Sequence, residues 1–172
     1  MSVYSPHTSF DSAALGINQT LAKKLGIDAP TPLQPLVDDP DGLGSGRVGK
    51  FSDPMSLGDL ATHACSELGI DGLHVVGDRE KMITKVAVAC GSGGSFLDAA
   101  KRKGCDALVT GESNFHTALD AKANSIALIL VGHYSSERFA VEDLAGHIKA
   151  EFDSLEVWAS EDECDPLQWL SR

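Results

Sequence analysis

Short apolar segments that alternate with helical segments constrain the fold of this 172-residue chain more than any other feature. These apolar segments are 73–76, 85–90 (KVAVAC), 107–110 and 126–131 (IALILV). Continuous apolar runs of this length are typical of strands buried on both faces of a sheet. Helical segments over 96–103 and 114–123 join them through short connections, which indicates parallel β-α-β units. We therefore predict an α/β fold in which a mostly parallel sheet is covered by helices on both faces.

The remaining elements are less regular. The apolar spacing predicts one helix over 12–25, which ends at Gly26. Ser56 and Asp59 form the N-cap pattern of a helix that runs to about Leu68. A last long helix is expected over 135–152.

Strand signals are weak outside the alternating region. We expect a short strand around 155–159 and the end of another at 2–5. Residues 38–54 are rich in Asp, Gly and Pro, which predicts a loop around a short strand near 47–51. The region before residue 57 therefore has one predicted helix and little strand, so the front half of the chain lacks a sheet of its own.

Charge and composition restrict the possible partners. The formal net charge is −11, and only 14 residues are Lys or Arg. Nucleic-acid binding depends on cations that neutralise phosphates, so direct DNA or RNA binding is disfavoured. No apolar run approaches the roughly 18 residues of a membrane helix, and the first residues do not form a secretory signal. The four scattered cysteines are expected to be reduced thiols in a cytoplasmic protein.

Polar residues follow two of the predicted strands. His133 and Glu137 lie four positions apart at the start of a helix, so both face the same way. Glu112 and His116 repeat the pattern in reverse order after the strand at 107–110. Both pairs are expected at the carboxyl edge of the sheet, where α/β proteins bind ligands and metals. The alternative for His133 and Glu137 is a solvated histidine beside a glutamate favoured by the helix dipole.

Two further segments carry possible site residues. The small residues of 91–95 (GSGGS) suit either a tight turn or a cradle of backbone N–H groups for phosphate. Near the start, His7 and Asp11 are four positions apart, although Asp11 or Ser12 could simply cap the following helix.

Taken together, these segments resemble a known family. In chain order they read SPHTSFDSA, GLGSGRVG, VAVACGSGGSF, VTGESNFH and GHYSSE. This order is similar to that of the Nif-three-like proteins, also called GTP cyclohydrolase I type 2 homologs, over about residues 2–160. The resemblance implies a two-lobed α/β fold, a dinuclear metal site with His, Asp and Glu ligands, and assembly of dimers into hexameric rings.

The resemblance also assigns roles to residues. By position, Asp11, His133 and Glu137 would be metal ligands. His7, Glu112 and His116 would line the same cavity as acid–base groups or groups that contact the ligands.

One feature of the family is absent. Its remaining ligands are two adjacent histidines upstream of the segment where this chain begins, and the sequence contains no His-His pair. The chain therefore resembles the C-terminal two-thirds of a family member, with a fold incomplete relative to the two-lobed one. Residues 1–37 would be a remnant of the N-terminal lobe with one ligand, and residues 38–172 the α/β lobe with the others.

The resemblance leaves two functional alternatives. The first is a hydrolase in which divalent ions of the zinc, iron or manganese type activate water against a nucleotide-like substrate, in a homo-oligomer. Because the histidine pair is absent, metal content is expected to be substoichiometric. The second is a catalytically inactive or truncated oligomeric scaffold, or a protein-interaction protein, that binds metal weakly.

Overall fold

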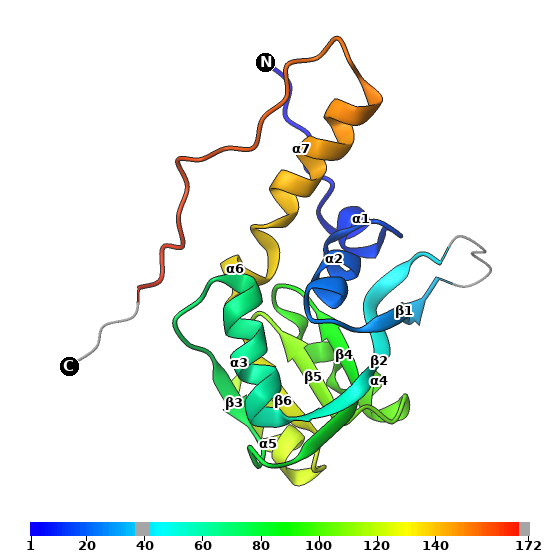
Figure 1. The fold of residues 1–172 in the computed structure, drawn as a ribbon, viewed down its shortest axis with the longest axis vertical. Coiled ribbons are helices and arrows are strands. Elements are labelled where there is room, and N and C mark those ends of the chain that lie inside the picture. The colour runs from blue at the N-terminus through cyan, green and yellow to red at the C-terminus, as the bar shows by residue number, and fades with distance from the viewer. Residues whose placement is uncertain (37–41, 169–172) are drawn as a thin grey trace.

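The protein forms a six-stranded sheet between helices in a computed structural model that describes residues 1–36 and 42–168 (Figure 1). The strand order is β1-β2-β4-β5-β6-β3. The strands are β1 (Asp28–Pro35), β2 (Gly44–Ser56), β3 (His74–Val76), β4 (Met82–Ala89), β5 (Ala107–Thr110) and β6 (Ala127–Leu130). Strand β5 is parallel to β4 and to β6, whereas the three outer pairings are antiparallel. The predicted α/β class is confirmed, and its parallel part occupies the middle of the sheet.

The helices complete the predicted β-α-β units. They are α1 (His7–Ser12), α2 (Ile17–Lys24), α3 (Leu57–Leu68), α4 (Leu97–Arg102), α5 (Phe115–Ala123), α6 (His133–Glu137) and α7 (Ala140–Glu151), with the 3-10 turn η1 (Gly93–Phe96) before α4. Helix α4 connects β4 to β5, and α5 connects β5 to β6. Helix α3 begins as predicted, because the Ser56 hydroxyl accepts the backbone N–H of Asp59 at 3.0 Å.

Two apolar layers cover the two faces of the sheet. Successive side chains of a strand point to opposite faces. On β4, Val86 and Val88 pack with apolar side chains of α2 and α3, whereas Ala87 and Ala89 pack with those of α4 and α5. The predicted helices on both faces are therefore confirmed.

The predicted helix over 12–25 is interrupted. Helix α1 ends at Ser12 and α2 begins at Ile17. At Gly16 the backbone is extended and passes so close to α1 that an added Cβ would lie 1.8 Å from the carbonyl oxygen of Phe10. Only glycine permits this close approach, which the apolar spacing could not reveal. The predicted helix over 135–152 is likewise divided, into α6 and α7.

The front half of the chain contributes more strand than predicted. Strands β1 and β2 pair with each other, and β2 pairs with β4, so both extend the same sheet. Strand β2 has 13 residues instead of a short segment near 47–51. The glycines of β2 weaken its strand pattern in the sequence. Gly49 is required by close packing, because an added Cβ would lie 2.4 Å from the Ile27 side chain. The strands predicted at 2–5 and 155–159 are wrong, because both segments are irregular.

The predicted division between residues 37 and 38 lies outside the described residues, as do residues 38–41 of the loop predicted over 38–54. Strand β1, before this boundary, hydrogen-bonds to β2, after it. The assignment of 1–37 and 38–172 to two lobes stays a prediction.

A buried arginine fixes α1 and α2 on the sheet. Arg47 of β2 is 1% exposed. Its guanidinium donates to the carbonyl oxygens of Gly44 and Gly46 at 2.7 Å, to that of Ala13 at 2.6 Å, and to the side-chain oxygen of Gln19 at 2.7 Å. Burial lowers the pKa of Arg47, and the four oxygens compensate for its lost hydration. The connection between α1 and α2 is thereby held against β2.

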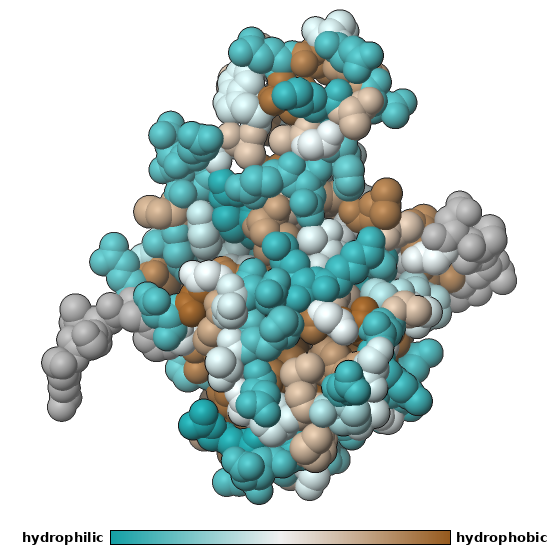
Figure 2. Space-filling model, in the orientation of Figure 1, coloured by the Kyte–Doolittle hydropathy of each residue, from teal (hydrophilic) through white to brown (hydrophobic). Residues whose placement is uncertain are grey.

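The ends of the chain lie outside the sheet. Helix α7 projects away from it, and the C-terminal segment returns along the molecule in an extended conformation (Figure 1). Hydrophilic side chains cover most of the face in view, with hydrophobic ones in small separate patches (Figure 2). Within the described ranges, no helix is both long and apolar enough to cross a bilayer.

Candidate functional site

Three parallel strands end at one edge of the sheet and bring their following residues together. Cys90 follows β4, Glu112 follows β5, and His133 begins α6 after β6. The turns hydrogen-bond across the edge: the N–H of Glu112 donates to the carbonyl of Gly91, and the N–H of Gly132 to that of Gly111, both at 2.9 Å. The carboxyl edge therefore gathers polar residues, as the sequence indicates.

His133 lies between two carboxylates. Its Nδ1 is 2.9 Å from Oε1 of Glu112, and its Nε2 is 3.5 Å from Oε1 of Glu137. The hydrogen bond to Glu112 is the main cause of a raised His133 pKa, and the charge of Glu137 adds to it. A carboxylate at Nδ1 orients an imidazole so that the lone pair of Nε2 can bind a metal ion, an arrangement common among histidine ligands. Glu112 is thus in the position of a group that orients His133.

Glu137 lies partly buried in the same cluster. Burial raises its pKa, and the negative charge of Asp11 acts in the same direction. The positive charges of His133 and His7 oppose this rise. The four side chains therefore interact electrostatically, and His7, the first residue of α1, belongs to the surroundings of Glu137.

Asp11 is attached to the edge through Cys90 and Asn18. The thiol of Cys90 donates to Oδ1 of Asp11 at 3.6 Å. Asn18, only 3% exposed, donates to the backbone carbonyl of Asp11 at 3.0 Å and accepts the backbone N–H of Cys90 at 2.8 Å. Burial, followed by the charges of Asp11 and Glu137, raises the pKa of Cys90 and keeps the thiol protonated.

Cys90 and Asn18 were not predicted to lie in the site. Cys90 lies at the carboxyl end of a predicted buried strand. Glu112 was chosen as a site residue because it follows the carboxyl end of the next strand. That position was the signal for Cys90. Asn18 had none, because its role depends on how α2 packs against β4.

The glycine-rich turn after β4 approaches the cluster closely. Gly91 has a φ of +60°, and an added Cβ would lie 2.3 Å from Oε1 of Glu137. Its N–H donates to the hydroxyl of Ser136 at 2.8 Å, and the N–H of Gly93 to that of Thr110 at 3.0 Å. These two N–H groups already have partners within the protein. The geometry therefore favours a tight turn over a phosphate cradle.

His116 lies on α5 in an exposed position. Its ring meets the ring of Phe115 edge-on, with 6.3 Å between the centroids. Its role as an acid–base group stays a prediction, as do the roles of His7 and Glu112.

The side chains of the cluster are of the types that bind metal ions, but their donor atoms are not arranged around a common point. Carboxylate oxygens and an imidazole nitrogen are suitable ligands for zinc, iron or manganese ions. As the side chains stand, however, no group of three or more His, Cys, Asp or Glu residues within 1–36 and 42–168 is arranged to hold a metal ion. The assignment of Asp11, His133 and Glu137 as ligands stays a prediction.

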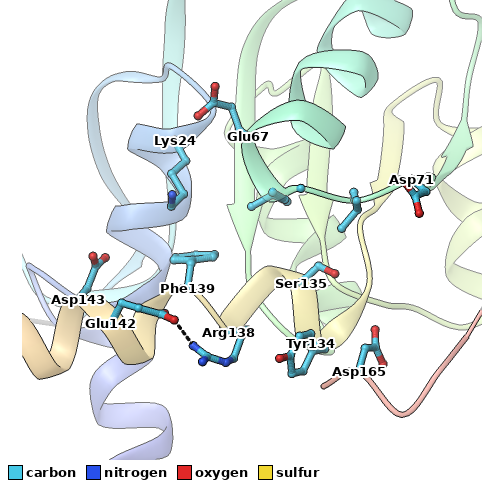
Figure 3. Close-up of a pocket in the computed structure, with 13 residues that line it drawn as sticks. Lys24, Glu67, Asp71, Tyr134, Ser135, Arg138, Phe139, Glu142, Asp143 and Asp165 are labelled. Atoms are coloured by element: carbon cyan, nitrogen blue, oxygen red, sulfur yellow. Dashed lines mark hydrogen bonds and ion pairs between the residues drawn. The ribbon is translucent and has the colours of Figure 1, made fainter. Parts of the chain in front are cut away.

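Two pockets flank α6. The first, here called the site pocket, has a volume of about 590 Å³ and includes His133 and Glu137 in its lining. The second, of about 600 Å³, is called the acidic pocket (Figure 3). Its carboxylates are Glu67, Asp71, Glu142, Asp143 and Asp165.

The cations of the acidic pocket already have partners. Arg138 pairs with Glu142 at 2.6 Å, the interaction drawn as a dashed line in Figure 3. The Lys24 ammonium lies 5.3 Å from the centre of the Phe139 ring. The Lys24 contact joins α2 to the start of α7, and the Arg138 pair joins the end of α6 to α7.

Comparison with known proteins identifies the family. The family model Duf34/NIF3 (NGG1p interacting factor 3) matches residues 1–166. A GTP cyclohydrolase 1 type 2 homolog of Clostridium perfringens is 30% identical over 171 residues, which are 99% of this chain and 65% of that protein. The NIF3-like protein 1 of Drosophila melanogaster is 31% identical over 97% of this chain and 57% of its own length. The chain thus spans less than two thirds of these relatives.

Solved structures agree in fold. A hypothetical protein of Staphylococcus aureus superimposes with a TM-score of 0.85 at 25% identity, covering 95% of this chain and 67% of that one. A Bacillus cereus protein related to NIF3 gives a TM-score of 0.88 over 97% of this chain and 73% of its own, and its 20% identity supports the fold alone. On the family match and these relatives, the chain belongs to the Duf34/NIF3 family.

Proposed function

We propose that this chain carries part of a divalent-metal-dependent hydrolase centre, in which Asp11, His133 and Glu137 bind ions of the zinc, iron or manganese type. The main support is the position of His133, with Nδ1 at 2.9 Å from Glu112 and Nε2 facing Glu137. When bound, such an ion would lower the pKa of a water molecule and polarise the bond to be hydrolysed.

The surrounding residues would hold and move protons. Glu112 would accept a hydrogen bond from Nδ1–H of His133 and so hold the proton on Nδ1. The lone pair of Nε2 would then be available to bind the ion. His7, whose charge acts on Glu137, is the first proposed acid–base group. His116 is retained as a second acid–base candidate because histidine titrates near neutral pH.

The proposed substrate is a small nucleotide-like molecule. Curated relatives carry the name GTP cyclohydrolase 1 type 2 homolog, which supports this class. The chain covers 65% of one such relative, so the reaction of the whole protein is part of the proposal. The proposal also includes assembly into a homo-oligomer and a cytoplasmic location.

Metal titration tests the proposed centre. We expect Zn²⁺ or Mn²⁺ to bind the purified full chain in calorimetry and His133→Ala or Glu137→Gln to weaken binding at least tenfold. His147→Ala is the matched control, because His147 lies exposed on α7. Equal affinities for the wild type and both site variants would refute the assignment of these ligands.

A scaffold without catalytic activity is the second candidate. It is favoured by one observation: the described side chains do not form a group of three donors around a common point. If this alternative holds, the chain will bind no ion above background while light scattering still finds a stable homo-oligomer.

A further inference from the structure

The site pocket has a largely apolar wall next to two candidate site residues. His133 and Glu137 lie in its lining, and its volume of about 590 Å³ is within the usual range for small-molecule sites. Its apolar side chains come from the N-terminal region, α2, α7 and the C-terminal segment. The larger ones include Pro6, Phe10, Ile17, Val141, Leu144 and Leu167. Val141 is 39% exposed and Leu167 is 76% exposed, so this apolar surface is accessible to a ligand.

The charges of the pocket are mainly negative. Its carboxylates are those of Glu137, Glu163 and Asp165. Among the described lining residues, Arg138 is the only lysine or arginine. His133, the other described lining residue that can carry positive charge, lies between the carboxylates of Glu112 and Glu137.

Arg138 is committed to protein partners. Its Nε lies 2.8 Å from Oε1 of Glu163, and its Nη1 lies 2.6 Å from Oε1 of Glu142. Its Nη2 donates to the carbonyl oxygen of Ser160 at 2.6 Å. The guanidinium thus holds the C-terminal segment against α6. Among the lining residues that the structure describes, a phosphate group entering the pocket would meet three carboxylates and no cation free of a carboxylate partner, which disfavours its binding.

We propose that the site pocket binds the uncharged ring system of a nucleoside or free base and disfavours the phosphorylated forms. The apolar wall would take the faces of the ring, and the acidic groups would accept its N–H donors. The bond to be hydrolysed would lie beside His133 and Glu137. This inference rests on the proposed function, from which the nucleotide-like class of substrate is taken.

Binding measurements without metal test the pocket directly. The full chain, in the presence of a chelator, is titrated by calorimetry with adenosine and inosine and with their 5′-monophosphates and 5′-triphosphates. We expect the nucleosides to bind at least tenfold more tightly than the monophosphates, and the triphosphates to bind most weakly. A monophosphate that binds as tightly as its nucleoside, or a chain that binds no nucleoside, would overturn the proposal.

Substitutions in the wall locate the binding. Leu144→Asp or Val141→Asp places a charge in the apolar surface and should weaken nucleoside binding at least tenfold. Leu155→Asp is the control, because Leu155 is 53% exposed and does not line the pocket. Asp165→Asn removes one carboxylate and should reduce the ratio of nucleoside affinity to monophosphate affinity severalfold. Circular dichroism confirms the fold of each variant, and unchanged binding in both wall variants would place the ligand elsewhere.

The two proposals fail separately. Zn²⁺ titration in the absence of chelator and of nucleoside tests the metal centre alone. Nucleoside binding without Zn²⁺ binding would remove the metal centre and leave the pocket assignment intact. If the protein binds Zn²⁺ but prefers phosphorylated ligands in the presence of chelator, the metal centre is retained and the pocket assignment is removed.

Discussion

The central strands and helix α7 both carry apolar residues, but only the strands bury them fully. All four residues of β5 are buried, whereas α7 buries Ala140 alone among its twelve residues. Val141 and Leu144, on α7, instead line the site pocket. The parallel strands thus form the most buried part of the fold, whereas α7 and the C-terminal segment contribute exposed apolar side chains to the wall of the site pocket.

The candidate site lies at the boundary between these two regions. Glu112 follows a buried strand, His133 and Glu137 belong to the short helix α6, and Asp11 comes from α1. The edge of the sheet therefore positions Glu112, whereas the less buried helices α1 and α6 position Asp11, His133 and Glu137. Stability and binding should respond separately to substitution in the two regions.

The largest effect on stability is expected from a cavity in the sheet. Leu128 of β6 is 0% exposed, so Leu128→Ala should lower the free energy of unfolding by about 2–5 kcal/mol. Leu155→Ala, the same change at a residue that is 53% exposed, should cost no more than about 0.5 kcal/mol. Urea denaturation followed by circular dichroism measures both. Similar losses in the two variants would contradict the division into a stabilising sheet and a peripheral surface.

A smaller effect is expected where the turn after β4 meets α6. Gly91 and Gly69 have similar left-handed φ values of +60° and +64°, so alanine strains the backbone at both by about 1 kcal/mol. An added Cβ meets nothing within 4 Å at Gly69 but comes within 2.3 Å of the Glu137 carboxylate at Gly91. Gly91→Ala should therefore destabilise the protein more than Gly69→Ala and should also displace Glu137.

The two glycine variants separate strain from crowding. Urea denaturation compares their stabilities, and the Zn²⁺ titration reports on Glu137. If Gly91→Ala and Gly69→Ala are equally stable and bind Zn²⁺ alike, the close contact between the turn and Glu137 does not matter in solution.

The sequence predicts the central sheet well because burial on both faces requires continuous apolar runs. Strand β5 matches its prediction at both ends, and β6 differs by one residue at each end. The parallel order of these strands also explains why Glu112 and His133 could be expected to meet. Their contact at 2.9 Å follows from adjacent turns at one edge.

The periphery is less predictable because its structure depends on glycines and tertiary contacts. Gly49 weakens the strand pattern of β2, and Gly16 lies in the break between α1 and α2, where the apolar spacing predicts one helix. The position of Asp11 depends on its hydrogen bonds with Asn18 and Cys90 and on the hydrogen bond between these two residues. Cys90 is distant in sequence from both Asp11 and Asn18. Such contacts leave no local pattern, so the approach of α1 to the cluster could be expected only from the family resemblance.

The smallest expected effect concerns the charge of His133. Glu112→Gln removes the carboxylate whose hydrogen bond is the main cause of the raised His133 pKa. The His133 pKa should then fall toward the ordinary imidazole value of about 6.5. NMR titration of the chelated protein measures this change. Glu151→Gln, at the far end of α7, is the matched control and should leave the His133 titration unchanged.

The same pair gives a pH dependence of defined sign. Because folding raises the His133 pKa, the protonated ring contributes stability that is complete below the unfolded value of about 6.5 and is lost as pH rises through the folded value. Glu112→Gln should reduce this contribution, so its stability deficit should be larger in acid than above the folded pKa. With His133 and Glu112 each about half exposed, the deficit should be small. A deficit that grows with rising pH would show that Glu112 stabilises the edge of the sheet by some other contact.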